Sequence, residues 1–490
     1  MSISKEVKTI ISKLEKAGFE AFIVGGCVRD FLRNVEPEDW DVATNAKPKE
    51  IQRIFPKSFY NNKFFTVTVQ TGGKKANLKE IEITTYRSEA KYTDKRHPDE
   101  IKFAKTIKED LSRRDFTVNA MAMDGELEII DPFNGQKDFK KKIIRAVGNP
   151  EKRFSEDALR MMRAVRFATT LDVSLSLTAS WQIEENTARA IEKNSPWLRA
   201  ISQERIRDEF LKIIMAERAS DGIELLRKLG LLKHIVPELE ENYGVSQNKH
   251  HIYDCYTHAL LSLKYAAKRK FNKFVRLAAL LHDIGKPRTK KGEGPEATFY
   301  GHEIVSAQMT AQILNRLKFP KKEIEKIVKL VRYHLFYYHP DEVGESSVRR
   351  LVRQVGPENM KELLEVRMAD RIGSGVPKAE PYKLRHLRYV IEKVSRDPIS
   401  VKTLEVSGNN VMKILKITPG PKVGQILDIL LGAVLEDPKK NKKEFLEKEI
   451  RKLAKVSDEK LKTLVQKARE ERARVEIKRD EMTKKKYWVT

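Results

Sequence analysis

The chain has 490 residues, of which 40% are hydrophobic and 34% charged, and Lys and Arg outnumber Asp and Glu by 96 to 70, for a net charge of +26. This length exceeds one compact core, so we expect two to four domains, and no apolar run approaches the roughly 18 residues that a membrane span needs. The positive charge favours a polyanionic partner, nucleic acid rather than membrane, although solubility alone could also account for it.

The first residues predict an amphipathic helix that ends at Gly18. The residues on its apolar face are Ile3, Val7, Ile10, Ile11 and Leu14. This stretch lacks the apolar core of a signal peptide. Only two cysteines occur, Cys27 and Cys255. We therefore expect a protein of the reducing cytoplasm.

The periodicity then changes along the chain. Strands are expected at Phe19–Val24, Phe64–Gln70 and Glu80–Thr84, alternating with helices, whereas from about Ser155 the pattern is helical. We expect a small α/β head and a long helical body. The expected domains are a head (1–150), a helical neck and body (151–240), a histidine-rich domain (245–375) and a basic helical tail (376–490).

Two acids of the head are spaced for a metal site. On a strand, the two-residue spacing of Asp39 and Asp41 points both carboxylates to one face. Such a pair needs a neutralising cation, and oxygen ligands suit Mg²⁺ or Mn²⁺. Glu82, on another expected strand, could be a third acid or an ordinary exposed strand residue. By itself, the Asp39–Asp41 spacing is also that of an acid-rich turn.

A glycine pair precedes these acids. Gly25 and Gly26 end a strand at a point where backbone N–H groups could meet a phosphate, and Arg29 lies one turn into the following helix. The ordered motifs G-G-x-x-R-D, D-x-D, E-I-T-T-Y-R and L-S-R-R-D-F-T-V-N-A-M-A resemble the head of the tRNA nucleotidyltransferase and bacterial poly(A) polymerase family. The resemblance covers at least residues 22–167.

This resemblance implies an α+β fold, with a polymerase-beta-like head built on a mixed sheet and an all-helical remainder. It implies two-metal nucleotidyl transfer, in which Asp39 and Asp41 hold Mg²⁺ and Glu82 matches a family acid. It also implies that Gly26, Arg29 and Arg114 contact the incoming triphosphate.

The stretch RFSEDALRMMRAVRFA carries a second constellation. Asp157 and Glu156 lie three and four residues before Arg160, which predicts one shared helical face and, at its simplest, a surface ion pair. Arginines recur at every third position with few acids to match them. The resemblance implies that the incoming nucleotide is bound by Asp157, Arg160, Arg163 and Arg166.

A carboxylate and a guanidinium together can select bases. Cytosine and adenine both present an amino donor beside a ring-nitrogen acceptor, whereas guanine and uracil reverse this pair. We therefore expect CTP and ATP as substrates. In the family, the position of Ser88–His97 holds a mobile loop linked to ATP incorporation, and its presence disfavours an enzyme that adds only cytidines.

Seven of the ten histidines lie between His250 and His339. The motif H-D-I-G-K-P, with a histidine before it and an aspartate well after it, offers mixed nitrogen and oxygen ligands for a divalent metal. It resembles the HD phosphohydrolase superfamily. The positions that match its four metal ligands are His258, His282, Asp283 and Asp370, and those that match the extra ligands of two-metal members are His302 and His334.

An HD domain can also keep its fold after losing its activity. For an active one, related enzymes imply phosphomonoesters or 2′,3′-cyclic phosphates at RNA ends as substrates. We expect neighbouring Tyr256, His250 and His251 to be ordinary core or surface residues.

The tail contains Pro419-Gly420-Pro421, which predicts a turn and a helix start where N–H groups could meet a phosphate. After Lys439 the basic helices could follow an RNA backbone or be a solvated face. The leading interpretation is an enzyme that adds C, C and A to tRNA with CTP and ATP, and that needs neither a membrane nor an obligate protein partner. The alternatives are an A-adding enzyme or poly(A) polymerase, an HD phosphohydrolase with a non-catalytic RNA-binding head, and a purely structural RNA-binding protein.

Overall fold

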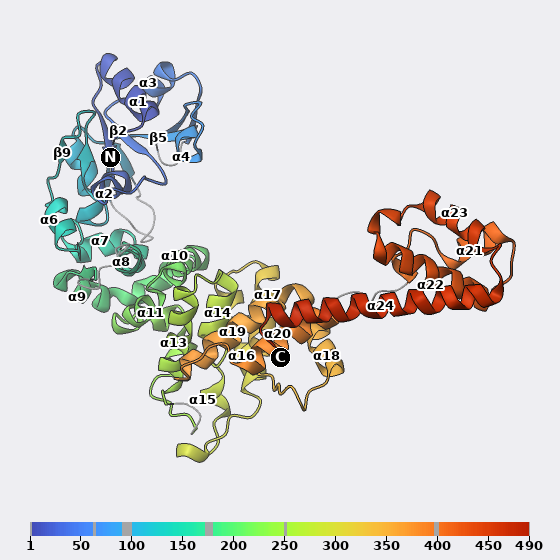
Figure 1. Ribbon diagram of the computed structural model, residues 1–490. Coiled ribbons are helices and arrows are strands. Elements are labelled where there is room, and N and C mark those ends of the chain that lie inside the picture. The colour runs from blue at the N-terminus through green and yellow to red at the C-terminus, as the bar shows by residue number, and fades with distance from the viewer. Residues whose placement is uncertain are drawn as a thin grey trace. The chain divides into compact units, whose positions relative to one another are not determined.

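The computed structural model describes residues 2–61, 65–90, 100–171, 180–248, 252–395 and 401–489 (Figure 1). The chain forms two compact units. The first comprises Met1–Leu335 and Glu365–Pro377, and the second comprises Phe336–Leu364 and Lys378–Thr490. Among the described helices, none is both long and apolar enough to cross a bilayer.

The head of the first unit is built on a mixed seven-stranded sheet with the order β3-β4-β5-β2-β1-β8-β9, in which β2 and β5 run parallel. The other neighbouring strands of this sheet pair antiparallel. Its strands are β1 (Ala21–Val24), β2 (Asp41–Thr44), β3 (Ser58–Asn61), β4 (Thr66–Gln70), β5 (Glu80–Thr85), β8 (Ala122–Met123) and β9 (Ile129–Ile130). A separate antiparallel pair is formed by β6 (Arg87–Ala90) and β7 (Glu100–Phe103).

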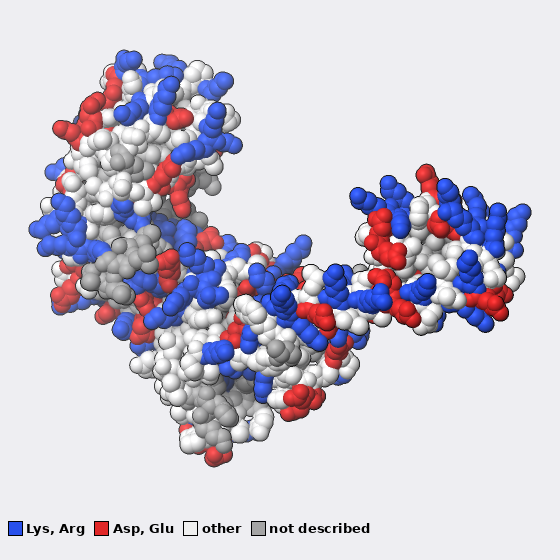
Figure 2. All heavy atoms as spheres, viewed as in Figure 1, with Lys and Arg blue, Asp and Glu red and all other residues white. Residues whose placement is uncertain are grey.

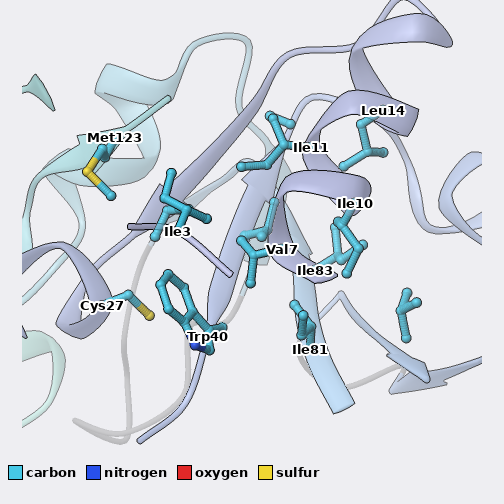
Figure 3. Packing of buried hydrophobic residues seen from close by; sticks show 14 of the residues in the cluster. Ile3, Val7, Ile10, Ile11, Leu14, Cys27, Trp40, Ile81, Ile83 and Met123 are labelled. Carbon is cyan, nitrogen blue, oxygen red and sulfur yellow. The ribbon is translucent and has the colours of Figure 1, made fainter. Parts of the chain in front are cut away.

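The head also contains helices. They are α1 (Lys5–Lys16), α2 (Gly26–Leu32), α3 (Pro48–Ile54), α4 (Ala76–Lys79), α5 (Ile107–Ser112) and α6 (Gly135–Lys140). The α1 prediction is confirmed: Ser4 caps the helix, and Val7, Ile10, Ile11 and Leu14 are buried. Figure 3 shows these side chains packed with Trp40, Ile81 and Ile83 in the head core. Spacing alone identified this face because an amphipathic helix is stabilised mainly by burying it.

The expected strands are present with shifted ends. β1 begins two residues later than predicted, and β5 extends one residue further. β4 covers Thr66–Gln70, and Phe64 of the predicted range lies outside the described residues. The fold class of a mixed-sheet head with a mostly helical remainder is confirmed.

Helices follow the head within the first unit. A short parallel pair, β10 (Ile143–Ile144) and β11 (Gln182–Ile183), lies among them. The neck helices are α7 (Pro150–Glu156), α8 (Leu159–Thr170), α9 (Glu185–Asn194), α10 (Gln203–Met215), α11 (Ala219–Lys228) and α12 (Pro237–Glu240). The helices of the histidine-rich region are α13 (Cys255–Lys268), α14 (Lys273–Leu281), α15 (Lys286–Thr289), α16 (His302–Arg316), α17 (Lys321–Arg332) and α19 (Met360–Gly373).

The second unit is helical. Its helices are α18 (Glu345–Val355), α20 (Tyr382–Ser395), α21 (Gly408–Leu415), α22 (Pro421–Glu436), α23 (Lys443–Leu453) and α24 (Asp458–Lys486). The predicted helix start at Pro421 is confirmed, with Gly420 as its N-cap. α22 runs beside α24 in Figure 1, and a Cβ added at Gly432 would lie 2.8 Å from the Cβ of Ala468, so small residues allow close packing there.

The surface of this unit is rich in charged side chains. Figure 2 shows Lys and Arg gathered over the region of α21 to α24, with Asp and Glu among them. Most of α24 is exposed, and its buried residues are Leu461, Val465 and Thr483. Both interpretations of the tail, an RNA contact and a solvated face, remain predictions.

Candidate functional site

The acids of the head meet on two parallel strands. β2 pairs with β5 so that Asp41 is the register partner of Glu82. The Glu82 amide donates to the Trp40 carbonyl at 3.3 Å. Asp39 lies two residues before β2, so the prediction of a strand under both aspartates is right for Asp41 alone. Asp39 and Glu82 are exposed and Asp41 is half-buried.

The charges of these acids interact. Burial raises the pKa of the Asp41 carboxyl to about 6, assisted by the nearby carboxylates of Glu82 and Asp39 and opposed by the Arg114 guanidinium. A raised pKa means that the folded chain disfavours a negative charge on Asp41. A cation between the carboxylates would relieve this repulsion, and Mg²⁺ is commonly bound by one or two protein carboxylates together with substrate phosphates. The donor set therefore fits this ion.

The glycine turn brings Arg114 to the acids. Gly25 has φ of +77°, a conformation that favours glycine, and an added Cβ would lie 2.6 Å from Nη1 of Arg114. Gly26 opens α2, and Arg29 donates from Nη1 to Oδ1 of Asn119 at 2.7 Å. Arg114 is also 3.3 Å from buried Asp110. The charge of the Arg114 guanidinium also interacts with that of Asp41, so Arg114 and the glycine turn that it contacts lie near this acid.

Cys27, which follows the glycine pair, contacts both aspartates through their backbone. Its Sγ lies 2.9 Å from the Asp39 carbonyl and 3.2 Å from the Asp41 amide. Burial and, to a smaller extent, the negative charge of Asp41 raise the pKa of this thiol to about 12. The thiol therefore stays neutral at neutral pH and can donate and accept at once.

Helix α8 adds a cluster of arginines. The guanidinium carbons of Arg29, Arg163 and Arg166 lie 5.3, 5.3 and 4.2 Å from the centroid of the Phe167 ring, which is buried. Cation–π contact with this ring stabilises positive charges that would otherwise repel one another. Two of the expected nucleotide-binding arginines, Arg163 and Arg166, thus lie with Arg29 of the head.

The expectation of few matching acids is wrong. Arg163 lies 2.6 Å from Asp115, and Arg166 lies 3.0 Å from Glu209. Burial would raise the pKa of Asp115, but the Arg163 guanidinium outweighs it and holds that pKa well below its usual range. These acids are distant in sequence from α8, so spacing within the helix could not reveal them. Asp115 belongs to the motif L-S-R-R-D-F-T-V-N-A-M-A, which was the available signal.

The expected pairing of Asp157 with Arg160 on one helical face is also wrong. α7 ends at Glu156, and Asp157 has extended backbone angles before α8 begins at Leu159. Asp157 is instead 2.7 Å from Arg205 of α10. The Glu156–Arg160 pair is present at 2.6 Å. Arg205 was missed because only tertiary packing brings α10 to this helix break.

Four of the ligand candidates of the histidine region, all histidines, surround Asp283. Oδ2 of Asp283 lies 3.1 Å from Nε2 of His258 and 3.3 Å from that of His282, and its Oδ1 lies 3.2 Å from Nε2 of His302 and 3.5 Å from that of His334. Asp370 lies 3.5 Å from His258. Two sets of three ligand atoms fall within 4.8 Å of one another: His258, His282 and Asp283, and Asp283, His302 and His334.

Hydrogen bonds orient these rings. The Nδ1 atoms of His282, His302 and His334 contact the carbonyls of Ala279, Phe299 and Val331 at 2.9, 2.7 and 2.7 Å. A ring that donates from Nδ1 presents Nε2 as a lone pair, which is how second-shell contacts orient metal-binding histidines. The residues therefore fit a divalent metal, with Asp283 common to both sets.

The pKa values of the cluster residues reflect their close charges. Burial lowers the pKa of His282, but Asp283 and Asp370 outweigh it and raise that pKa to about 10. These carboxylates have pKa values well below their usual range despite their burial. Positive charge is thus favoured at His282, whereas burial and the nearby His282 charge lower the pKa of His334. Lys286, which sequence reasoning did not single out, supplies a positive charge at 2.6 Å from Asp283.

A cavity of about 500 Å³ opens beside the cluster. Its lining includes the cluster residues Asp283, His302, His334 and Asp370, together with Lys286, Arg367 and Tyr300. Tyr300 is 85% exposed. The cavity combines expected metal ligands with cationic and aromatic side chains, a set suited to a phosphate ester.

Other expected residues fall elsewhere. Tyr256 is a core residue, 2% exposed, whose hydroxyl donates to Glu224 at 3.1 Å. His250 and His251 lie outside the described residues, as does most of the expected Ser88–His97 loop; Ser88 itself is in β6.

Comparisons with known proteins agree with this arrangement. Residues 21–145 match the family model "Poly A polymerase head domain", residues 181–243 match "Probable RNA and SrmB-binding site of polymerase A", and residues 251–373 match "HD domain". The chain spans about half the length of the first curated relatives that it matches, 51% and 54%. Other matches extend over nearly the whole of the relative.

The chain is 33% identical over 434 residues to a CCA-adding enzyme of Lactobacillus delbrueckii subsp. bulgaricus, a match that covers 88% of this chain and 93% of the relative. It is 32% identical over 427 residues to an A-adding tRNA nucleotidyltransferase of Deinococcus radiodurans, covering 84% and 91%. Among solved structures, a Bacillus stearothermophilus CCA-adding enzyme in complex with CTP matches with a TM-score of 0.59 and 29% identity, covering 91% of this chain and 96% of that one.

Proposed function

The chain belongs to the family of tRNA nucleotidyltransferases and bacterial poly(A) polymerases that carry an HD domain, and we propose that it adds C, C and A to the 3′ end of tRNA without a template, using CTP and ATP. The observation that carries this proposal is the register pairing of Asp41 with Glu82, with Asp39 alongside. Three interacting carboxylates beside a glycine turn and arginines match the needs of nucleotidyl transfer.

In the proposed reaction, the RNA 3′-hydroxyl attacks the α-phosphate of the nucleotide and pyrophosphate leaves. Asp39 and Asp41 would hold Mg²⁺, which supplies charge neutralisation at the phosphates when bound. Arg114, held by Asp110 against the Gly25 turn, binds the triphosphate together with Arg29 and the backbone of Gly26. Glu82 adds negative charge beside Asp41 and so strengthens the attraction for the cation.

Base selection is assigned to Asp157 and Arg160, with Arg163 and Arg166 beside them. Arg205 holds the Asp157 carboxylate and Glu156 holds Arg160, which fixes both side chains before a nucleotide arrives. A carboxylate has about four acceptor positions and a guanidinium has five N–H donors, so each retains capacity for a base. The carboxylate accepts from the amino group of C or A and the guanidinium donates to the ring nitrogen.

The assay uses purified protein and three RNAs: tRNA lacking the whole CCA end, tRNA lacking only the final A, and an unrelated RNA. Each is incubated with CTP, ATP or both, and products are resolved at single-nucleotide length. Addition of C, C and A to the first RNA supports the proposal. Addition only to the second indicates an A-adding enzyme, and long A tracts on the third indicate a poly(A) polymerase. No incorporation on any RNA refutes nucleotidyl transfer.

A second function, metal-dependent phosphohydrolysis, is favoured by the Asp283 cluster and its cavity. The candidate substrates are RNA ends with a 3′-phosphate or a 2′,3′-cyclic phosphate. A His282→Ala, Asp283→Ala variant should lose hydrolysis and keep nucleotide addition, whereas Asp39→Ala with Asp41→Ala should do the reverse. If the wild type hydrolyses neither end with Mg²⁺, Mn²⁺, Co²⁺ or Ni²⁺ supplied, this second function is discarded.

A further inference from the structure

The segment Asp39–Asp41 is held at three backbone atoms. The Cys27 thiol donates to the Asp39 carbonyl at 2.9 Å and accepts from the Asp41 amide at 3.2 Å. The carbonyl of Trp40, between them, accepts from the amide of Glu82 at 3.3 Å. Because Asp39 precedes β2, sheet pairing does not fix its carbonyl, and the thiol takes that place.

The side chains alternate along this segment. Trp40 is 3% exposed and lies beside Cys27 in the head core, as Figure 3 shows. Asp39 lies in a bend and is exposed, and Asp41, where β2 begins, is half-buried, so the buried Trp40 separates two carboxylates that are less buried than it is. Cys27 is itself 2% exposed and is placed by α2, which begins at the glycine turn.

We propose that Cys27 is a positioning residue for nucleotidyl transfer, because its thiol fixes the backbone at both Asp39 and Asp41 and thereby the spacing of the two carboxylates. This inference rests on the proposed nucleotidyl transfer. One side chain ties the glycine turn, which faces the triphosphate, to the acids that hold the cation. A shift of one of these parts is therefore transmitted to the other.

The position calls for a side chain that is small, apolar enough for the core and able to both donate and accept. Serine keeps both hydrogen-bonding roles but has a shorter bond to its heteroatom, whereas alanine loses both roles together with the volume of the sulfur. Misplacement of reacting groups by about 1 Å can cost on the order of 100-fold in rate. Alanine should therefore affect the rate more than serine does.

The test measures kcat, the KM for CTP and the Mg²⁺ concentration for half-maximal rate in wild type, Cys27→Ala and Cys27→Ser. We expect Cys27→Ala to lower kcat by roughly 10- to 100-fold and to raise the half-maximal Mg²⁺ concentration several-fold, with KM changed by less than about twofold. Cys27→Ser should recover most of this loss. Cys255→Ala, at the other buried cysteine, controls for the loss of a core thiol and should leave addition unchanged.

Cys27→Ala could also simply destabilise the head, so each rate is divided by the fraction of folded protein from thermal denaturation. A variant that melts lower but has the wild-type kcat and Mg²⁺ dependence per folded molecule overturns the inference. If the wild type adds no nucleotide, the proposed function fails instead, and Mn²⁺ binding then decides the inference. Bound Mn²⁺ is measured by electron paramagnetic resonance in the wild type and in the Asp39→Ala, Asp41→Ala variant. The difference between the two is the Mn²⁺ that the head binds. Unchanged affinity for this Mn²⁺ in Cys27→Ala contradicts positioning, and weaker affinity supports it.

Discussion

Asp41 and Glu82 are direct register partners on the parallel strands β2 and β5, so two carboxylates of like charge are neighbours across the sheet. Like charges on neighbouring strands destabilise a sheet. The head retains this pair, together with Asp39, at a position where burial already disfavours negative charge. Such a cost is typical of a site that is completed by a cation.

The first prediction concerns stability without metal. The pKa of Asp41 is raised to about 6, so the folded state holds this proton more tightly than the unfolded chain, and stability is lost as pH rises from about 4 through 6. In EDTA at pH 8, Asp41→Asn should therefore raise the free energy of unfolding by on the order of 2 kcal/mol. At pH 4 the gain should vanish. Urea denaturation at both pH values measures it, and a gain that is independent of pH contradicts the assignment.

The second prediction separates Glu82 from its neighbour. Glu82→Gln should lower kcat for nucleotide addition by roughly 100-fold with a small change in KM, because it removes charge beside Asp41. Glu80 lies two residues earlier on β5, is also exposed and pairs with Gln70. Glu80→Gln is therefore a matched control and should keep the wild-type rate. Equal losses in the two variants would mean that β5 acts through general surface charge.

A third prediction uses the buried Asp115–Arg163 pair. The Asp115 pKa is lowered in the folded state, so its contribution to stability is present above the unfolded value near 3.9 and is lost as pH falls below it. Asp115→Asn should destabilise the protein by about 3 kcal/mol at pH 7, since it leaves a buried guanidinium unpaired. The difference from wild type should shrink below pH 4. Asp221→Asn, in the more exposed pair with Arg218, should cost less than about 1 kcal/mol.

Arg276 provides a fourth prediction. Its guanidinium is 4% exposed and donates to the carbonyls of Phe271, Ile214 and Ala216 at 2.8, 3.0 and 2.9 Å. Arg276→Met should destabilise the protein by about 3–5 kcal/mol, because buried acceptors lose their donors. Chemical denaturation measures the loss, and exposed Arg269→Met should change stability by less than about 0.5 kcal/mol. A neutral Arg276→Met would show that water replaces the guanidinium.

The fifth prediction is metal stoichiometry. Asp283 belongs to both sets of candidate ligands, whereas His302 belongs to one. After saturation with Mn²⁺ and dialysis, Asp283→Ala should lose the metal of both sets and His302→Ala the metal of one, as measured by elemental analysis. His339→Ala, outside the cluster, should retain all of it. Full retention by Asp283→Ala would refute a shared ligand.

Sequence reasoning reached some site residues and not their partners. The six ligand candidates of the histidine region could be named because their motif fixes residue type and order. The four histidines among them surround Asp283, and Asp370 lies beside His258. The Asp157–Arg160 pairing was wrong because helical spacing assumes one continuous helix, and α7 ends at Glu156. Neither Arg205 nor Glu209 carried a signal, since helix α10 meets α8 only through packing.

The acids of the head show the same division between local pattern and tertiary structure. By itself, the sequence determined the elements and the chemistry: the face of α1, the glycine turn, and acids spaced two apart, because hydrophobic periodicity and residue type act locally. Only the tertiary structure decided that Glu82 lies directly beside Asp41, that Asp39 precedes the strand, and that Cys27 joins them. Strand register and buried hydrogen bonds depend on residues distant in the chain, and no local pattern specifies them.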